Sequence, residues 1–520
     1  MKRFKLYFFI QVLFCTNLFS QTPPTLQWQK CYGGTKFEIS NAIKQTSDGG
    51  YIVAGYTASN DSDVSGNKGG TEDAWIIKIS NTGSLQWQKC VGGSLMDVFQ
   101  DVLQTVDGGY IAVGYSYSND SNVSGNHGKS DFWIVKLSST GSLVWQKCYG
   151  GSKIDIAYKV IQCMDGEFLI AGSTESNDSN VNGNKGNSDG WLVKVNGSGV
   201  LQWQKCFGGM SNDAIRSIQQ TADSGFVFTG TTSSSDTNIL GNHGGQDLWV
   251  LKLDKTINIQ WQKCYGGTQS ETGFSVQNTS DGGYIIAGNT TSNDGDIASG
   301  NKGQYDFWVL KLTSSGIISW QKCIGGSNMD EAYSVIQTTD GGYVVSGYTQ
   351  SNDIDVIGNH GNTPDYWLVK LSSSGNILWQ KCYGGSSTDI AYTLQQTSDG
   401  GLILSGESLS HDGDVFGNHG NFDFWVVKLS SITTEISETE KKNEINFYPN
   451  PSTGIFNLTN DNDEKLQTII LDMNGKIIDE FALDSRTEKQ LNYVNLADGI
   501  YVVRLFNENK SMQQKFVIHK

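Results

Sequence analysis

Oxygen-bearing side chains recur in one loop of a repeated sequence unit, with the spacing of calcium ligands. In the third copy, Gly183 stands at relative position 6, and ligand candidates stand at positions 1, 3, 5 and 12: Asp178, Asn180, Asn182 and Asp189. The second copy repeats this spacing around Gly125: Asp120, Asn122, Ser124 and Asp131. Carboxylate and amide oxygens on a Gly-bent loop are the ligands that Ca²⁺ prefers. Ca²⁺ is therefore the cofactor that the sequence suggests.

The same loops also have a purely structural interpretation. Position 5 is Leu240 in copy four and Phe416 in copy seven, and neither side chain can bind a metal ion. Copies one, five and six are one residue longer. Because Asp and Asn form Asx turns with neighbouring backbone groups, such loops also form without a metal. Both interpretations stay open at this point.

A second loop carries an acid in every copy, four residues after a Gly-Gly pair. The seven acids are Glu38, Asp97, Asp155, Asp213, Glu271, Asp330 and Asp389. If consecutive strands alternate in direction, this Gly-Gly loop and the longer Asp/Asn loop lie on the same face of the fold. We expect the seven acids to belong to a ligand-binding face.

A catalytic site has less support in the sequence. Catalysis needs a unique group of residues, and a motif repeated seven times does not supply one. The residues that break the repeat, such as Arg216, Glu167, Glu407 and His411, are scattered over different copies. We therefore assign no catalytic residue. A hydrolase or lyase with one active site in a central channel is the alternative hypothesis.

The loops belong to a unit that repeats every 58 or 59 residues. Two tryptophan series account for all 14 Trp. The tetrapeptide Trp-Gln-Lys-Cys begins at Trp28, Trp87, Trp145, Trp203, Trp261, Trp320 and Trp379, and the pattern Asp-x-Trp ends at Trp75, Trp133, Trp191, Trp249, Trp308, Trp367 and Trp425. Alternating apolar residues, an Asp-Gly-Gly turn and a Ser/Thr/Gly turn predict four strands per unit.

The strand count predicts an all-β fold with a seven-bladed β-propeller over residues 22–430. A Trp-Gln-Lys-Cys strand precedes the first unit, and the last unit ends near Leu429 without one. The N-terminal strand can complete the last blade and close the ring, which a β-solenoid, the alternative, would not require. The units resemble bacterial cell-surface β-propeller repeats, a likeness that specifies no activity.

Composition excludes some partners and suggests a compartment. With 37 Lys and Arg against 53 Asp and Glu, the formal charge of −16 argues against nucleic acid. Residues 1–20 have the basic, apolar and polar order of a secretory signal peptide. No later segment is apolar enough for a membrane span, so the mature chain is predicted to be secreted. Equivalent cysteines on neighbouring blades would be too far apart for disulfides, which predicts buried free thiols.

The repeat ends before a polar linker at residues 431–444. Residues 445–520 alternate apolar runs with Asn, Asp and Gly turns, which predicts a small C-terminal β-sandwich. Its motifs include Tyr448-Pro449-Asn450-Pro451, Gly454, Gly475, Gly499, Tyr501 and the terminal Lys520. In order and spacing they resemble the type A sorting domain of the type IX secretion system. This resemblance implies Sec export, recognition by the type IX machinery in a Bacteroidota-like envelope, and release or attachment at the cell surface.

These features together suggest a secreted or cell-surface binding protein. We expect a non-enzymatic propeller that binds a glycan or a protein through several weak, equivalent sites, because weak sites gain from avidity. A hydrolase or lyase and a passive structural surface protein are the alternatives.

Overall fold

The computed structural model describes residues 21–236, 239–298, 300–432, 445–460, 464–472, 476–507 and 511–520. The predicted signal peptide, most of the linker and Gly475 lie outside the described residues. The chain divides into two compact units, Met1–Thr434 and Glu435–Lys520. The described residues form β-strands and no helix, which confirms the all-β prediction.

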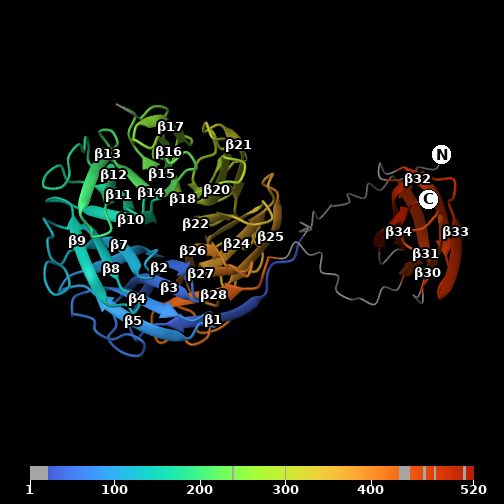
Figure 1. The fold of residues 1–520 in the computed structure, drawn as a ribbon, viewed down its shortest axis with the longest axis horizontal. Helices are drawn as coiled ribbons and strands as arrows, with labels where there is room; N and C mark the ends of the chain where they lie inside the picture. The colour runs from blue at the N-terminus through green and yellow to red at the C-terminus, as the bar shows by residue number, and fades with distance from the viewer. Residues whose placement is uncertain are drawn as a thin grey trace, which may run out of the picture. The chain divides into compact units, whose positions relative to one another are not determined.

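In the described part of the first unit, 28 strands form seven antiparallel four-stranded sheets (Figure 1). The first three sheets, in chain order, comprise β2 (Glu38–Gln45), β3 (Tyr51–Thr57), β4 (Asp73–Ile79) and β5 (Leu85–Val91); β6 (Asp97–Gln104), β7 (Tyr110–Ser116), β8 (Asp131–Leu137) and β9 (Leu143–Tyr149); and β10 (Asp155–Gln162), β11 (Phe168–Thr174), β12 (Asp189–Val195) and β13 (Leu201–Phe207). The next three comprise β14 (Asp213–Gln220), β15 (Phe226–Thr232), β16 (Asp247–Leu253) and β17 (Ile259–Tyr265); β18 (Glu271–Asn278), β19 (Tyr284–Thr290), β20 (Asp306–Leu312) and β21 (Ile318–Ile324); and β22 (Asp330–Gln337), β23 (Tyr343–Thr349), β24 (Asp365–Leu371) and β25 (Ile377–Tyr383). The last sheet comprises β26 (Asp389–Gln396), β27 (Leu402–Ser408), β28 (Asp423–Leu429) and the N-terminal strand β1 (Leu26–Tyr32).

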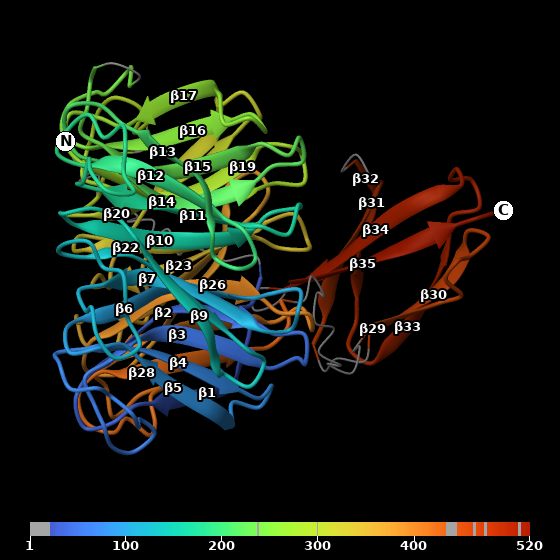
Figure 2. The same cartoon turned by 60° about the vertical axis from the view of Figure 1, so that its left-hand side comes forward.

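The first strands of the seven sheets are neighbours in space. β2 contacts β6 and β26, and each other first strand contacts those of the sheets before and after it in the chain. In Figure 1, β2, β10, β14, β18, β22 and β26 surround the centre of the first unit. Figure 2 shows β2, β10, β14, β22 and β26 from another side.

Each first strand contains a β-bulge at the same position. The pairing of β2 with β3 skips one residue between Ser40 and Ala42, and every other first strand skips the equivalent residue. The skipped residues are Asn41, Gln100, Tyr158, Arg216, Phe274, Tyr333 and Tyr392, here called the bulge residues. Beside the bulge of β2 lies Gly55, where a Cβ atom would stand 1.9 Å from the Ile39 carbonyl oxygen. Glycine is needed there because the two backbones approach closely.

The apolar core of the first unit lies between adjacent sheets. The Trp of every Asp-x-Trp motif is at most 1% exposed. The Trp75 ring lies 4.6 Å from that of Phe424 in the last sheet, and its Nε1 donates to Gln88 Oε1 at 2.9 Å. Gln88 belongs to a Trp-Gln-Lys-Cys motif, so the Gln of this motif accepts the hydrogen bond from the buried indole N–H of the Asp-x-Trp series. Eight cysteines in the described residues are free, and all but Cys206 are buried, as predicted.

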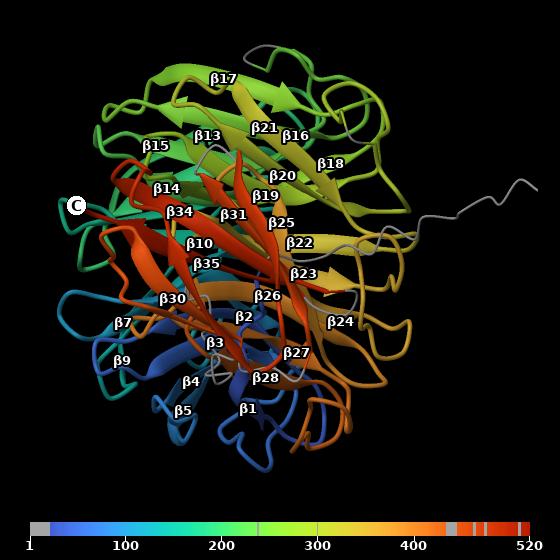
Figure 3. The same ribbon diagram turned by 90° about the vertical axis from the view of Figure 1, so that its right-hand side faces the viewer.

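The second unit contains two sheets around one apolar core. β29 (Ile445–Tyr448), β30 (Ile455–Asn460) and β33 (Thr487–Asn492) form one sheet, and β31 (Leu466–Asp472), β32 (Ile477–Leu483), β34 (Gly499–Phe506) and β35 (Ser511–Ile518) form the other. Phe456 and Leu458 of the first sheet share a core cluster with Val503 and Phe516 of the second. This is the predicted small β-sandwich, whose strands are also visible in Figure 3.

Candidate functional site

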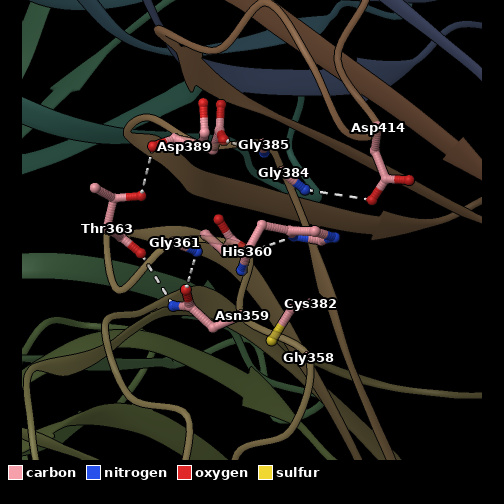
Figure 4. A network of polar contacts seen from close by, with 12 residues as sticks. Gly358, Asn359, His360, Gly361, Thr363, Cys382, Gly384, Gly385, Asp389 and Asp414 are labelled. Atoms are coloured by element: carbon pink, nitrogen blue, oxygen red, sulfur yellow. Dashed lines mark hydrogen bonds and ion pairs between the residues drawn. The ribbon is translucent and has the colours of Figure 1, made fainter.

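The acids of the Gly-Gly loops are buried and bonded to their own loops. In the last sheet, Asp389 Oδ2 accepts a hydrogen bond from Gly385 N (Figure 4) and another from Ser410 Oγ, both at 2.8 Å. All seven are at most 1% exposed: Glu38, Asp97, Asp155, Asp213, Glu271, Asp330 and Asp389. Each of them accepts a bond from the second Gly of its pair. Their carboxylates thus fix the loop backbone, and direct contact with a ligand stays a prediction.

The Asp of each Asp-x-Trp motif forms a second series of buried acids. Asp365 Oδ2 accepts a bond from His360 N at 2.9 Å and lies 2.6 Å from His360 Nδ1. The Oδ1 atom has no hydrogen-bond partner among the described residues in any of the seven: Asp73, Asp131, Asp189, Asp247, Asp306, Asp365 and Asp423. Buried oxygens without partners are uncommon, so these atoms are a distinctive feature of the fold.

The two series of acids meet at the first Gly of each Gly-Gly pair. A Cβ atom on Gly92 would lie 2.6 Å from Asp73 Oδ1 and 2.6 Å from Asp97 Oδ2. No side chain fits between these carboxylates, which explains the glycine. Burial, followed by the charge of Asp97, raises the pKa of Asp73 to about 6.

Several of the predicted calcium ligands already accept hydrogen bonds within the protein, and the bonds of Asn122 and Asn182 involve their backbone atoms. Asp120 Oδ1 accepts a bond from Ser94 N, and Asp178 Oδ1 one from Ser152 N, both at 2.8 Å. The other predicted ligands are bonded as follows: Asn122 N donates to Gly92 O, Asn180 Oδ1 accepts from Gly150 N, Ser124 Oγ and the Asn182 carbonyl accept from glutamines, and Asp131 and Asp189 accept from His127 N and Lys185 N. Among the described residues, no group of three or more His, Cys, Asp or Glu is placed to hold a metal ion. The calcium site stays a prediction.

A central cavity of about 170 Å³ lies between the first strands of the seven sheets. Its lining residues come from β2, β6, β10, β14, β18, β22 and β26, and all seven bulge residues are among them. A bulge redirects the side chain of the extra residue. The cavity is therefore lined by the extra residue of each bulge, and these residues differ in type among several of the seven units.

The charged and aromatic residues of this cavity are unevenly distributed. Lys44, Lys159 and Arg216 line it, and its lining residues in the described chain include no carboxylate. The Arg216 guanidinium lies 4.1 Å from the centre of the Tyr158 ring. Further round, the Tyr333 ring lies 5.0 Å from Phe274 and 5.2 Å from Tyr392. A cationic region thus adjoins an aromatic one.

Sequence reasoning found Arg216 as a departure from the repeat but did not place it in a cavity with the other bulge residues. The available signal was the Gly inside the second strand of each sheet, such as Gly55, because a Gly within a strand pattern often marks a bulge.

Glu407 and Tyr392 are in contact, with the Tyr392 hydroxyl donating to Glu407 Oε1 at 3.1 Å. Burial raises the pKa of Glu407 to about 7.

The sorting motifs of the second unit are joined by hydrogen bonds. Asn450 Oδ1 accepts a bond from Val517 N at 2.9 Å, and Ser452 N donates to Val517 O. Lys520 N donates to the carboxylate of Asp498, which directly precedes Gly499. The structure also places the other described motif residues. The Tyr448 hydroxyl donates to Glu488, Gly454 has a φ of 102°, and the Tyr501 hydroxyl donates to the Ala497 carbonyl. Motifs from both ends of the unit therefore meet at β35.

Comparison with known proteins gives limited matches to the repeats. The regulatory protein FlaEY of Caulobacter vibrioides is 25% identical over 187 residues, which cover 33% of this chain but only 19% of that protein. A puromycin hydrolase structure is 11% identical with a TM-score of 0.43, covering 84% of this chain and 62% of that one. Sqt1 from Chaetomium thermophilum is 8% identical with a TM-score of 0.38, covering 78% of this chain and 100% of that one.

The second unit has a clear family match. Within the described chain, we find no helix with the length and apolar character needed to cross a membrane. Residues 446–519 match the family model of the secretion system C-terminal sorting domain, which confirms the resemblance of the terminal motifs. The chain therefore carries a type IX sorting domain that directs it to the cell surface or the extracellular space.

Proposed function

We propose that residues 22–430 form a seven-bladed β-propeller, closed by β1, that acts outside the cell as a non-enzymatic binding module. In this proposal, residues 1–20 are the signal peptide, 431–444 the linker and 445–520 the sorting domain that engages the type IX machinery. The ligand is a glycan or a protein. The observation that carries the binding role is the central cavity, where unlike side chains from all seven repeats converge.

The burial of the loop acids bears on where the ligand binds. Seven equivalent loops would offer seven equivalent sites, but their carboxylates are committed to backbone and hydroxyl groups. The cavity instead offers one site of mixed polar, cationic and aromatic character. A single site in the channel is therefore favoured over several weak sites on the loops.

A hydrolase or lyase is the second candidate, and Glu407 is the observation that favours it. A buried carboxyl with a pKa near 7 can hold a proton at neutral pH, as a general acid must. Glu407 is 5% exposed and lies beside the bulge residue Tyr392. The glycan experiment below therefore also measures cleavage.

The test is a screen of the labelled full chain on a glycan array, with Ca²⁺ and with a chelator. We expect saturable binding of a restricted set of glycans, without cleavage of those glycans on incubation. Binding lost with the chelator would support calcium at Asp131 or Asp189, each of which has one carboxylate oxygen without a hydrogen-bond partner within the described segments. Cleavage that is abolished by Glu407→Gln would instead establish the enzyme. A chain that binds no glycan and no extracellular protein would contradict the binding role.

A further inference from the structure

The central cavity has an excess of positive charge in an otherwise acidic protein. Lys159 Nζ is paired with Asp101 Oδ1 of β6 at 3.0 Å, and Asp101 Oδ2 also accepts a bond from Val160 N. This pairing commits the Asp101 carboxylate to Lys159 and the backbone, whereas Lys44 and Arg216 line a cavity whose described lining residues include no carboxylate. The charge of Lys159, together with burial, lowers the pKa of Lys44 to about 8. An anion in the cavity would relieve this repulsion.

Arg216 is the residue best placed to receive that anion. Its Nε atom is buried and has no hydrogen-bond partner among the described residues. One face of the guanidinium stacks on Tyr158, which orients it without using its N–H groups. A guanidinium presents its N–H groups in a planar fork that matches the two oxygens of a carboxylate.

The aromatic residues define the rest of the ligand. Phe274, Tyr333 and Tyr392 form a continuous series of ring contacts at 5.0 and 5.2 Å beside the cavity. Aromatic side chains in a pocket pack against the apolar faces of a ring-shaped ligand, and a few polar groups fix its orientation. Asn41, Gln100 and Ser217 supply such polar groups for hydroxyls. The volume of about 170 Å³ is close to that of an engineered cavity of about 150 Å³ that holds one benzene molecule, so the cavity fits one ring-sized residue rather than a chain.

A neighbouring cavity is less suited to an anion than the central one. Tyr158 and Arg216 also border a second cavity of about 220 Å³, whose lining includes Glu175 and Asp213. These carboxylates would repel an anion. The central cavity is therefore the anion site of the two.

We propose that the central cavity binds one acidic sugar residue, a hexuronate, with Arg216 holding its carboxylate and the aromatic bulge residues packing against its ring. This inference rests on the proposed binding function and names its ligand class. A free uronate and the terminal residue of an acidic polysaccharide share this chemistry.

The test is titration calorimetry of the full chain with galacturonate, with its methyl ester and with galactose. The ester keeps the ring but removes the charge, so it and galactose should bind at least about tenfold more weakly. A polygalacturonate arm distinguishes the two sources. A site for chain ends binds each chain with an affinity that does not depend on chain length, whereas a site for the free uronate does not bind the polymer. Galacturonate that does not bind, or an ester that binds equally well, would overturn the inference.

Arg216→Gln is the matched variant, because Gln100 occupies the equivalent bulge of the second sheet and the fold accepts it there. It should weaken galacturonate binding by about 10- to 100-fold. Arg216→Lys, which keeps the charge but loses the fork, should lie between. Lys255→Gln removes one charge from an exposed turn outside the cavity and should leave affinity unchanged. Near-ultraviolet circular dichroism checks the fold of each variant.

Two outcomes separate this inference from the proposed function. If a ligand found on the glycan array binds Arg216→Gln as tightly as the unaltered chain, the binding function stands and the uronate site is wrong. If galacturonate binds, if Arg216→Gln weakens that binding by about 10- to 100-fold, and if Glu407→Gln changes neither binding nor cleavage, both stand.

Discussion

The buried acid Asp73 shows how one repeated residue couples the fold to pH. Its Oδ1 has no hydrogen-bond partner in the part of the chain that the structure describes, and it faces Asp97 across Gly92. Burial raises its pKa to about 6, and equivalent causes raise that of Asp330, Asp389 and Asp423 to about 6. Because an unfolded Asp titrates near 3.9, the contribution of each to stability is fully present below about pH 4 and lost as the pH rises through about 6.

We therefore predict that the full chain melts at a higher temperature at pH 5 than at pH 7.5, at constant ionic strength. The turn acids Asp48 and Asp107, with pKa values of about 2, stay ionised across this range and do not reverse the trend. Scanning calorimetry at the two pH values measures it. Asp73→Asn imitates the protonated acid and can donate to Asp97, so it should stabilise by about 1 kcal/mol at pH 7.5 and change little at pH 5. A Tm that does not rise at pH 5, or an Asp73→Asn effect equal at both pH values, would contradict the argument.

In each sheet, a Lys of the third strand pairs with the acid in the turn of the first hairpin. Lys370 Nζ lies 2.7 Å from Asp340 Oδ1, with side-chain exposures of 0% and 14%. The equivalent pair, Lys78 and Asp48 at 2.9 Å, has exposures of 4% and 54%. Burial of both partners makes loss of one more costly, because the remaining charge is left without water.

The repeat supplies a matched pair of variants for this point. Asp340→Ala should lower the free energy of unfolding by about 3 kcal/mol, and Asp48→Ala by about 1 kcal/mol. Both substitutions also remove the same turn hydrogen bonds, to Gly342 N and Gly50 N, so the difference between them reports the burial of the pair. Urea unfolding of the two variants measures it. Equal losses would mean that turn geometry, and not the ion pair, sets the cost.

The sequence predicted the strands well because their signals repeat. Trp425 and Gln29 lie nearly four hundred residues apart, yet the two Trp motifs implied that their strands share a sheet, and Trp425 Nε1 donates to Gln29 Oε1 at 2.8 Å. The cavity was harder to predict, because comparing repeats emphasises what they share, and Arg216 or Tyr333 differ from their equivalents. The burial of Asp97 was not predictable either, since its partners Ser116 and Ser118 depend on how the strand ends fold together.

The chain begins and ends the first unit in the same sheet. β1 pairs with β28, in the register Gln29 with Val427 and Cys31 with Trp425. Trp28 Nε1 then donates to Asn81 O in the first sheet, and Ser40 Oγ lies 2.7 Å from Ser405 Oγ. β1 therefore adds a hydrogen bond between the last sheet and the first, which also contact each other directly through β2, β26 and β27.

Removal of residues 22–32 from the full chain should therefore weaken the entire first unit and not only its last sheet. β28 would become an exposed edge, and Trp425, fully buried in the intact chain, would lose its covering strand and the Gln29 acceptor. We expect a lower Tm and broader unfolding by tryptophan fluorescence. A synthetic peptide of residues 22–34, added in trans, should restore the Tm by strand addition, whereas a scrambled peptide should not. A truncated chain that melts like the intact one would show that the seven sheets do not depend on closure by β1.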